Sequence, residues 1–190
     1  MYKTTLVLAT LLLTLVGCAQ SPQQIKLNPH INVNSYVQNQ PTVYLSVIDK
    51  RPSKSLGTRG GTYRNSNHIT LAKDLQTMLK PAATAALNEM GVVVDKPSPM
   101  PIDIQLWVEK LQYDVNDTQT LPIEVKVQAQ IAAVANKDSR QQVARYESSK
   151  VHKFFTAPST EKNEQIINEI VSETLTRLFN DPKLITLIQQ

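Results

Sequence analysis

Apolar residues occupy every second position between Leu121 and Ala135, which is the clearest pattern in the chain. All residues of one parity are apolar, whereas Glu124 and Lys126 are among those of the other. A period of two over this length predicts a long β-strand with one buried face and one wet face. A shorter alternation over residues 42–49 predicts another strand, whose two partly apolar faces are typical of a central position.

Further strands are expected on both sides of this pattern. Residues 102–108 carry apolar side chains on one parity and residues 111–115 on the other, and a β-bulge near Glu109 and Lys110 explains the change of phase. Residues 141–155 alternate more weakly, so we expect them to form a return strand near the edge of the sheet.

Two segments have the three- and four-residue spacing of apolar side chains that amphipathic helices require. They are residues 70–90 and residues 161–179, and a short third helix is expected after residue 181. Pro81 lies inside the first helix, where it removes one backbone donor and clashes with the preceding turn. We expect it to kink this helix, and a break into two helices is the alternative.

The order of the elements, with a short strand at Val92–Val94, is β-α-β-β-β-β-α-α. Such a chain has one apolar sheet face and two amphipathic helices to cover it. The expected fold is therefore α+β in two layers: a mostly antiparallel, four- to five-stranded sheet with two main helices packed on one face. A chain of 190 residues is long enough for one such domain, which we place at residues 42–190.

The first residues have the composition of an export signal. Lys3 precedes an apolar stretch at residues 6–16, which is too short to span a bilayer but suits the core of a signal peptide. The stretch ends in Leu15-Val16-Gly17-Cys18 with the only cysteine of the chain, and this sequence resembles the bacterial lipobox. The resemblance implies a signal peptide at residues 1–17 and a diacylglycerol on the Cys18 thiol, with a further acyl chain such as palmitate. An unmodified cysteine after an ordinary signal peptide is the alternative.

Several acyl chains anchor a protein stably, so we expect this covalent lipid to hold the chain in a membrane. Ala19 follows Cys18 at the position where the inner-membrane retention signal of enteric bacteria has Asp. By resemblance to lipoprotein sorting, the protein is expected in the outer membrane and facing the periplasm. No cofactor other than the covalent lipid is expected.

Residues 19–41 are rich in Gln, Asn, Pro and Ser and carry one charge, Lys26. Such a segment has too little apolar area to offset the entropy that is lost on ordering. We therefore expect residues 18–41 to form a flexible tether with a root-mean-square reach of about 25–30 Å. The alternative is a short edge strand formed by Ile25–Leu27 or Ile31–Val33.

Short motifs spread over nearly the whole chain carry a family resemblance. They are the lipobox, a Val-x-Asp-x-Arg sequence at Val47–Arg51, Leu56-Gly57, the helix end at Met90–Val94 and the C-terminal helix. In this order and spacing they resemble the YajG-type lipoproteins of Gram-negative bacteria. The resemblance implies an envelope lipoprotein with a small α/β periplasmic fold and no assigned activity.

Charge is distributed unevenly along the chain. The total of 20 basic and 16 acidic residues gives a net charge of +4, which is too small for a dedicated nucleic-acid-binding protein. The irregular segment at residues 49–67 contains five of the basic residues and one acidic residue, so it holds the whole positive excess of the processed chain. A loop of this length in a compact domain is either functional or disordered.

The basic residues of this loop are the candidate binding residues. Fork-shaped Arg side chains suit phosphate and carboxylate groups, so we assign Arg51, Lys54, Arg59 and Arg64 to the binding of an anionic partner. Lipid headgroups, lipopolysaccharide phosphates, peptidoglycan carboxylates and an acidic protein surface all have this chemistry. The alternative is a solvated loop in which Asp49 and Arg51 form a local ion pair.

The sequence has no recognisable catalytic or metal-binding motif. His30, His68 and His152 lack ligand spacing, and the single thiol is assigned to the lipid. Trp107 and Tyr113 suggest an aromatic shelf for a sugar, although packing within the sheet is favoured. We therefore expect no catalytic residues, no metal and no enzyme activity.

The expected function is a non-enzymatic binding or scaffold module that faces the periplasm. Its expected partners are the membrane, through the lipid on Cys18, and an envelope protein or anionic envelope component, with no nucleic acid. An auxiliary subunit of a lipid or solute transport system is the alternative, and a peptidoglycan-modifying enzyme is less favoured.

Overall fold

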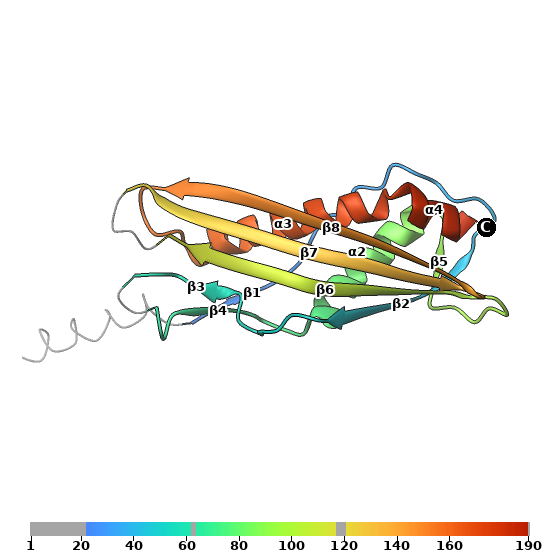
Figure 1. Ribbon diagram of the computed structural model, residues 1–190, viewed down its shortest axis with the longest axis horizontal. Helices are drawn as coiled ribbons and strands as arrows, with labels where there is room; N and C mark the ends of the chain where they lie inside the picture. The colour runs from blue at the N-terminus through green and yellow to red at the C-terminus, as the bar shows by residue number, and fades with distance from the viewer. Residues whose placement is uncertain (1–21, 62–63, 117–120, 190) are drawn as a thin grey trace, which may run out of the picture.

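Three long antiparallel strands form the middle of the molecule in the computed structural model, which describes residues 22–61, 64–116 and 121–189. They are β6 (Ile102–Val115), β7 (Ile123–Lys137) and β8 (Arg140–Phe154), with β7 between the other two (Figure 1). The predicted alternation is confirmed from Val125, since every second residue up to Ala135 is buried, but Leu121 lies before the strand and is exposed, and Ala132 and Val134 on the other face are buried as well. The pairing of β6 with β7 shifts between Val108 and Lys110, which confirms the β-bulge.

The remaining strands extend this ribbon into a mixed sheet of eight strands. They are β1 (Gln23–Ile25), β2 (Thr42–Asp49), β3 (Gly57–Thr58), β4 (His68–Leu71) and β5 (Val93–Val94). β2 lies between β5 and β6 and runs parallel to both, so its predicted central position is confirmed.

The prediction of four to five mostly antiparallel strands was wrong in number and in direction. After β2 the chain returns through helix α2 (Leu75–Glu89), and therefore β5 and β6 start at the same end of the sheet as β2. The strands that the sequence pattern missed, β3 and β4, are too short to show an alternation of side chains.

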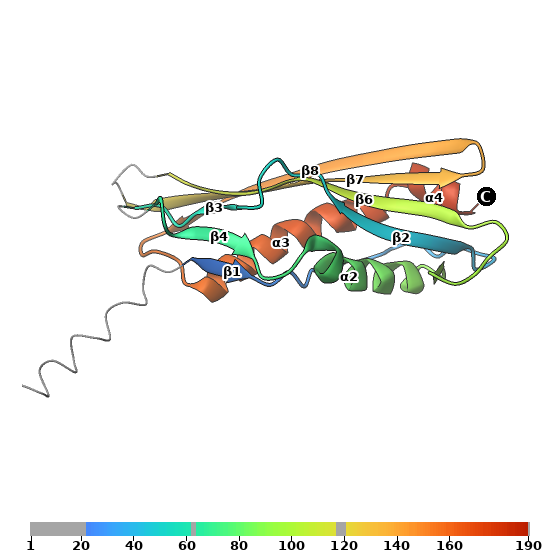
Figure 2. The same cartoon turned by 90° about the horizontal axis from the view of Figure 1, so that it is seen from below.

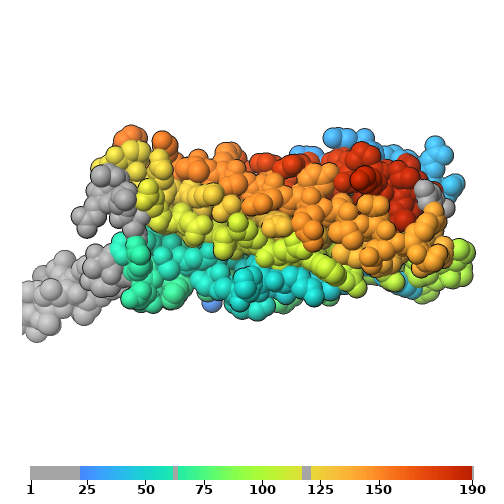
Figure 3. Space-filling view, in the orientation of Figure 1, coloured from blue at the N-terminus to red at the C-terminus, as the bar shows by residue number. Residues whose placement is uncertain are grey.

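Three helices cover one face of the sheet (Figure 2). They are α2, α3 (Thr160–Phe179) and α4 (Pro182–Gln189). This arrangement confirms an α+β fold with two layers. The opposite face of the three long strands is turned toward the viewer in Figure 3.

The first helix begins later than the sequence pattern predicted. Thr70 lies in β4, and the side chain of Asp74 accepts a hydrogen bond from the backbone N–H of Thr77, so the helix starts after this cap. Pro81 lies inside an unbroken helix, on its exposed side, which excludes the alternative of two helices.

The core lies between the helices and the covered face of the sheet. α3 contributes a stripe of apolar side chains, and β6 and β7 contribute the alternating residues. Full burial of a Leu or Ile side chain stabilises a fold by about 1.5–3 kcal/mol. The largest fully buried side chains include Tyr113, Phe179, Leu75, Leu79 and Leu106.

Residues 22–41 are fastened to the body, which corrects the prediction of a flexible tether over this part of residues 18–41. β1 pairs parallel with β4, so a short edge strand is present, slightly earlier than the alternative located it. Residues 26–34, which we call the N-terminal strap, then run along α3 with alternate residues buried. The predicted signal peptide at residues 1–17 and the predicted lipid on Cys18 lie outside the described residues.

Backbone N–H groups of the strap donate to side chains at every fourth position of α3 and its C-cap. The pairs are Lys26 with Glu164 (2.9 Å), Asn28 with Asn168 (2.7 Å), His30 with Ser172 (3.0 Å), Asn32 with Thr176 (3.1 Å) and Asn34 with Asn180 (2.8 Å). Two residues of extended chain advance about 6.6 Å and four residues of helix about 6 Å, and therefore the two repeats stay in register.

Candidate functional site

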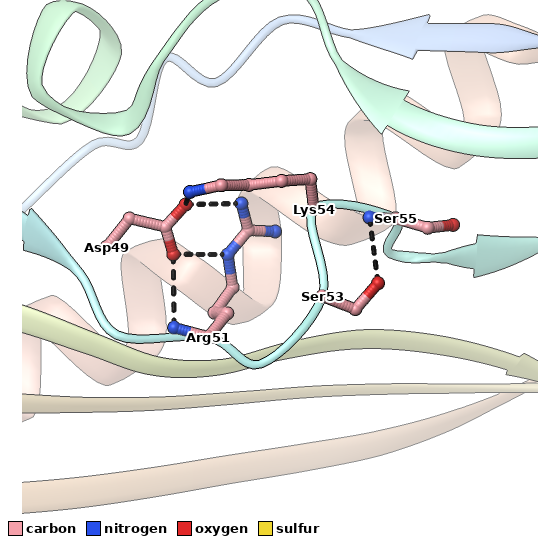
Figure 4. Close-up of polar contacts among 5 residues, drawn as sticks. All are labelled: Asp49, Arg51, Ser53, Lys54 and Ser55. Carbon is pink, nitrogen blue, oxygen red and sulfur yellow. Dashed lines mark hydrogen bonds and ion pairs between the residues drawn. The ribbon is translucent and has the colours of Figure 1, made fainter.

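The loop after β2 begins with a salt bridge between Asp49 and Arg51 (Figure 4). The Nε and Nη2 atoms of Arg51 donate to different carboxylate oxygens of Asp49, both over 2.9 Å, and the backbone N–H of Arg51 donates to the same carboxylate over 3.1 Å. Two parallel charged hydrogen bonds are stronger than neutral ones and fix the plane of the guanidinium. The local ion pair that the sequence left as an alternative is therefore present.

Lys54 reaches the same carboxylate. Its Nζ lies 2.6 Å from Oδ2 of Asp49, so one negative charge faces two positive charges. Burial by itself raises the pKa of Asp49, but hydrogen bonds from Arg51 and Lys54 outweigh this effect and hold the pKa well below its usual value. Asp49 is therefore ionised at neutral pH, and the three side chains together carry a net positive charge.

Arg51 is buried. Its side chain is 4% exposed, and its Nη1 atom has no hydrogen-bond partner among the described residues. Nearly all buried donors are paired in native proteins, and an unpaired one costs about 1–3 kcal/mol. The Nη1 atom of Arg51 is therefore a buried donor without an acceptor in the part of the chain that the structure describes.

Two pockets flank Arg51. The first, which we call the β2 pocket, has a volume of about 330 Å³ and lies between the end of β2 and the start of α2. Its lining includes Asp49, Arg51, Lys54, Lys73 and Asp74, so three cations face two carboxylates. The second pocket, of about 270 Å³, lies on the side of the β-bulge in β6. The lining of the β2 pocket has a net positive charge, and its volume has room for a small anionic group.

Arg59 and Arg64 lie apart from this pocket, in the hairpin of β3 and β4. The backbone N–H of Arg59 donates to the carbonyl of Asn67, and that of Arg64 donates to the carbonyl of Gly61. Arg59 is half-buried and Arg64 is exposed. The four candidate residues therefore form two groups, one at the β2 pocket and one in the hairpin.

Gly57 positions this hairpin against β6. It pairs with Tyr113, and a Cβ atom at Gly57 would lie 1.9 Å from the carbonyl oxygen of Tyr113. Only glycine allows the two backbones to approach this closely. The Leu56-Gly57 motif thus serves the packing of the sheet.

Trp107 and Tyr113 lie on opposite faces of the sheet, which excludes a shared aromatic shelf. The β-bulge between them changes which parity of β6 faces the helices. Trp107 is only partly buried, and the Nζ atom of Lys50 lies 5.0 Å from the centre of its ring. Tyr113 is fully buried.

A buried hydrogen-bond network, which the sequence patterns did not reveal, joins β6, α3 and β1. The Tyr113 hydroxyl donates to Oδ1 of Asn163 over 2.7 Å, and Nδ2 of Asn163 donates to Oε1 of Gln23 over 2.8 Å. Burial raises the pKa of Tyr113, so its hydroxyl stays a donor. The one sequence feature that points to this network is Asn163, a polar residue on the apolar stripe of α3 beside Ile166 and Ile170.

The part of the chain that the structure describes has no group of three His, Cys, Asp or Glu side chains placed to hold a metal ion. In the same part, no helix combines the length and the apolar character that crossing a membrane requires.

Comparison with known proteins gives one family. The model of a family described as uncharacterized lipoprotein matches residues 29–189. No curated protein matches the chain.

Several solved structures resemble this fold. A crystal structure of a protein from Xanthomonas campestris has a TM-score of 0.58 at 13% identity and covers 88% of this chain and 97% of its own. A crystal structure of an uncharacterized protein has a TM-score of 0.51 at 9% identity and covers 84% of this chain and 97% of its own. A minor lipoprotein from Acinetobacter baumannii has a TM-score of 0.38 at 14% identity, covering 79% of this chain and 91% of its own. At such identities the first two structures show a shared fold alone.

Proposed function

The chain belongs to the family of uncharacterized lipoproteins, and from this premise we propose that it is a non-enzymatic binding module of the bacterial envelope. A lipoprotein is anchored in a membrane, and we assign the anchor to a lipid on Cys18. We further assign the protein to the outer membrane, facing the periplasm, and to the YajG-type lipoproteins. The lipobox, the residue Ala19 and the motifs quoted above support these assignments.

The observation that carries the binding role is the β2 pocket. Arg51, Lys54 and Lys73 outnumber the two carboxylates of its lining, and a buried N–H group of Arg51 has no acceptor among the described residues. A carboxylate or phosphate group supplies negative charge and acceptor oxygens together. The partner that we propose is therefore an envelope component that presents one such group.

Phosphate and acetate ions are minimal probes of this pocket. Thermal unfolding of the full, lipidated chain in detergent is measured in phosphate, acetate and chloride at equal ionic strength. Binding to the folded state raises Tm. We expect phosphate or acetate to stabilise the native chain relative to chloride, and the double variant Lys54→Gln, Lys73→Gln to lose this gain.

The matched control is Lys137→Gln with Lys183→Gln, which removes the same charge from residues outside the lining of the pocket. This control should keep the full gain in Tm. If neither ion stabilises the native chain, or if both double variants lose the gain equally, the β2 pocket is not the binding site.

An auxiliary role in lipid or solute transport is a second proposal, and one groove favours it. The groove has a volume of about 500 Å³ and lies between the strap and α2, with Leu27, Met78 and Pro81 in its lining. Ala72, also in the lining, offers a test, since Ala72→Trp should fill the space. A fluorescent fatty acid that binds the native chain but not this variant supports the transport role, whereas no binding to the native chain rejects it.

A further inference from the structure

One end of the elongated body gathers the elements that lie nearest to the N-terminus. β1 and the β3–β4 hairpin meet there with the end of β6, the start of β7 and the end of β8 (Figures 1 and 2). The pairings of Gln23 with Ile69 and of Ile123 with Phe154 lie at this end. We call it the anchor end.

The segment before β1 is too short to reach far from the anchor end. Gln23 is fastened by its pairing with Ile69 and by the hydrogen bond from Asn163, and Cys18 precedes it by five positions. An extended chain advances at most about 3.6 Å per residue, which limits this linker to about 18 Å. β6 alone, with 14 residues, is about 46 Å long. A lipid on Cys18 therefore holds the anchor end, and not the opposite end, at the membrane.

The anchor end exposes apolar side chains. Phe155, directly after β8, is 79% exposed, and Leu121, just before β7, is 65% exposed. Val151 on β8 is 51% exposed. Water is an unfavourable environment for such side chains, whereas aromatic and aliphatic groups are stable at the boundary between headgroups and acyl chains.

The charges at this end suit an anionic membrane surface. Glu124 is paired with Lys153 over 3.1 Å, and Asp114 lies opposite Lys126 in the pairing of β6 with β7. The β3–β4 hairpin adds two arginines at this end, Arg59, which is half-buried, and Arg64, which is exposed. Basic side chains near a bilayer are attracted to anionic headgroups.

We propose that the anchor end is a second membrane contact, in which Phe155 and Leu121 enter the headgroup region of the leaflet that holds the lipid on Cys18, while Arg59 and Arg64 face anionic headgroups. The inference rests on the proposed lipid anchor, because a few exposed apolar side chains alone bind a bilayer weakly. The short linker keeps these side chains beside the surface, and so the contact forms within a molecule that is already anchored. The long axis of the body then points away from the bilayer.

Quenching of tryptophan fluorescence by brominated acyl chains tests this contact. The chain has one Trp, so Trp107→Phe gives a background without tryptophan. In this background Phe155→Trp reports on the anchor end, and Met100→Trp is the matched control. Met100 is 62% exposed and precedes β6, at the opposite end of the molecule. The full, lipidated variants are reconstituted into vesicles of phosphatidylglycerol and phosphatidylethanolamine with brominated chains.

Flotation of the vesicles measures anchoring, and quenching measures contact. We expect both variants to float, the fluorescence of Phe155→Trp to fall at least twofold and that of Met100→Trp to stay unchanged. Equal quenching of the two variants in floated vesicles would overturn the membrane contact and leave the anchor intact. Loss of flotation would overturn the anchor itself, and this inference with it.

The role of the arginines has its own test. Arg59→Glu with Arg64→Glu should reduce the quenching of Phe155→Trp at least twofold, whereas Lys96→Glu with Lys183→Glu, which changes the net charge equally, should not. Replacing phosphatidylglycerol by phosphatidylcholine should have the same effect without any charge substitution, which keeps the test valid if the arginine variant does not fold. Quenching that is independent of anionic lipid contradicts the headgroup contact.

Discussion

The backbone N–H of His30 donates a hydrogen bond to the hydroxyl of Ser172, 3.0 Å away, although 142 positions separate the two residues in the chain. Four further bonds of the same kind hold the rest of the strap to α3. Between the bonded residues, Leu27 and Ile31 point into the core and are buried. These contacts together offset the entropy lost when a polar segment becomes ordered.

Asn168→Ala should loosen the strap. The Asn168 side chain accepts from the N–H of Asn28 and donates to the carbonyl of Lys26, so its removal should cost about 1–2 kcal/mol. Limited proteolysis should cut the strap about tenfold faster, since 1.4 kcal/mol corresponds to a factor of ten. Asn88→Ala, on the exposed side of α2, is the control and should leave the rate unchanged. Equal rates for both variants would contradict the role of the side chain.

Tyr113→Phe should lower the free energy of unfolding by about 1–3 kcal/mol, because it leaves the buried amide oxygen of Asn163 without a donor. Urea unfolding followed by circular dichroism measures the change. Tyr36→Phe removes the same hydroxyl from a side chain that is 64% exposed and should have almost no effect. A similar loss in both variants would show that the network does not stabilise the fold.

Asp49→Asn should destabilise the protein by about 3 kcal/mol at pH 7, because it leaves the buried guanidinium of Arg51 without its counter-charge. The pKa of Asp49 is lower in the folded state than in the unfolded chain, so its stabilising effect is complete above pH 4 and is lost as the pH falls further. The difference between native and variant protein should therefore shrink from pH 4 towards pH 2, as measured by urea unfolding. Asp138→Asn, in an exposed turn, is the control; a constant difference at all pH values contradicts the prediction.

Gly57→Ala should separate β3 from β6, because the new Cβ would lie 1.9 Å from the carbonyl oxygen of Tyr113. We expect a loss of about 3 kcal/mol or more and faster hydrogen exchange at the amide of Tyr113, which donates to Leu56. Gly61→Ala introduces a methyl group into open space at a φ of +76° and should cost only about 1 kcal/mol. Equal costs at the two glycines would argue against a close approach at Gly57.

Cys18→Ala should release the protein from membranes, since it removes the thiol that the lipid requires. Fractionation of cells expressing the full chain measures the membrane-bound share. Ser21→Ala is the control and should stay in the membrane fraction. A Cys18→Ala protein that remains membrane-bound would reject the assigned anchor.

The long strands were predictable because their side-chain period is imposed by the burial of one face. β2 and β7 follow the alternation, and the phase change in β6 identified the bulge at Glu109. Strand direction was not predictable in this way, because a parallel and an antiparallel neighbour of β2 require the same alternation. The sequence pattern did not predict the docking of the strap. Its hydrogen bonds join every second backbone N–H of the strap to every fourth side chain of α3 and its C-cap. The trace of that repeat in the sequence is a run of hydrogen-bonding side chains from Glu164 to Asn180.

The basic loop was identified from charge, but charge alone does not reveal burial. Arg51 and Arg64 are equivalent in the sequence pattern. In the structure Arg51 is buried and paired with the carboxylate of Asp49, whereas Arg64 lies exposed in a hairpin. Lys73, which completes the β2 pocket, lies outside the loop in sequence and comes near because α2 starts beside the end of β2. Such proximity depends on the fold and has no sequence signal of its own.

The strap also sets an order of events during biogenesis. Its residues are among the first to be synthesised, while the acceptors from Glu164 to Asn180 are among the last. Until α3 has been synthesised, the strap lacks the side chains that accept its backbone hydrogen bonds. The strap therefore docks only after nearly the whole chain is available, although it lies close to the N-terminus.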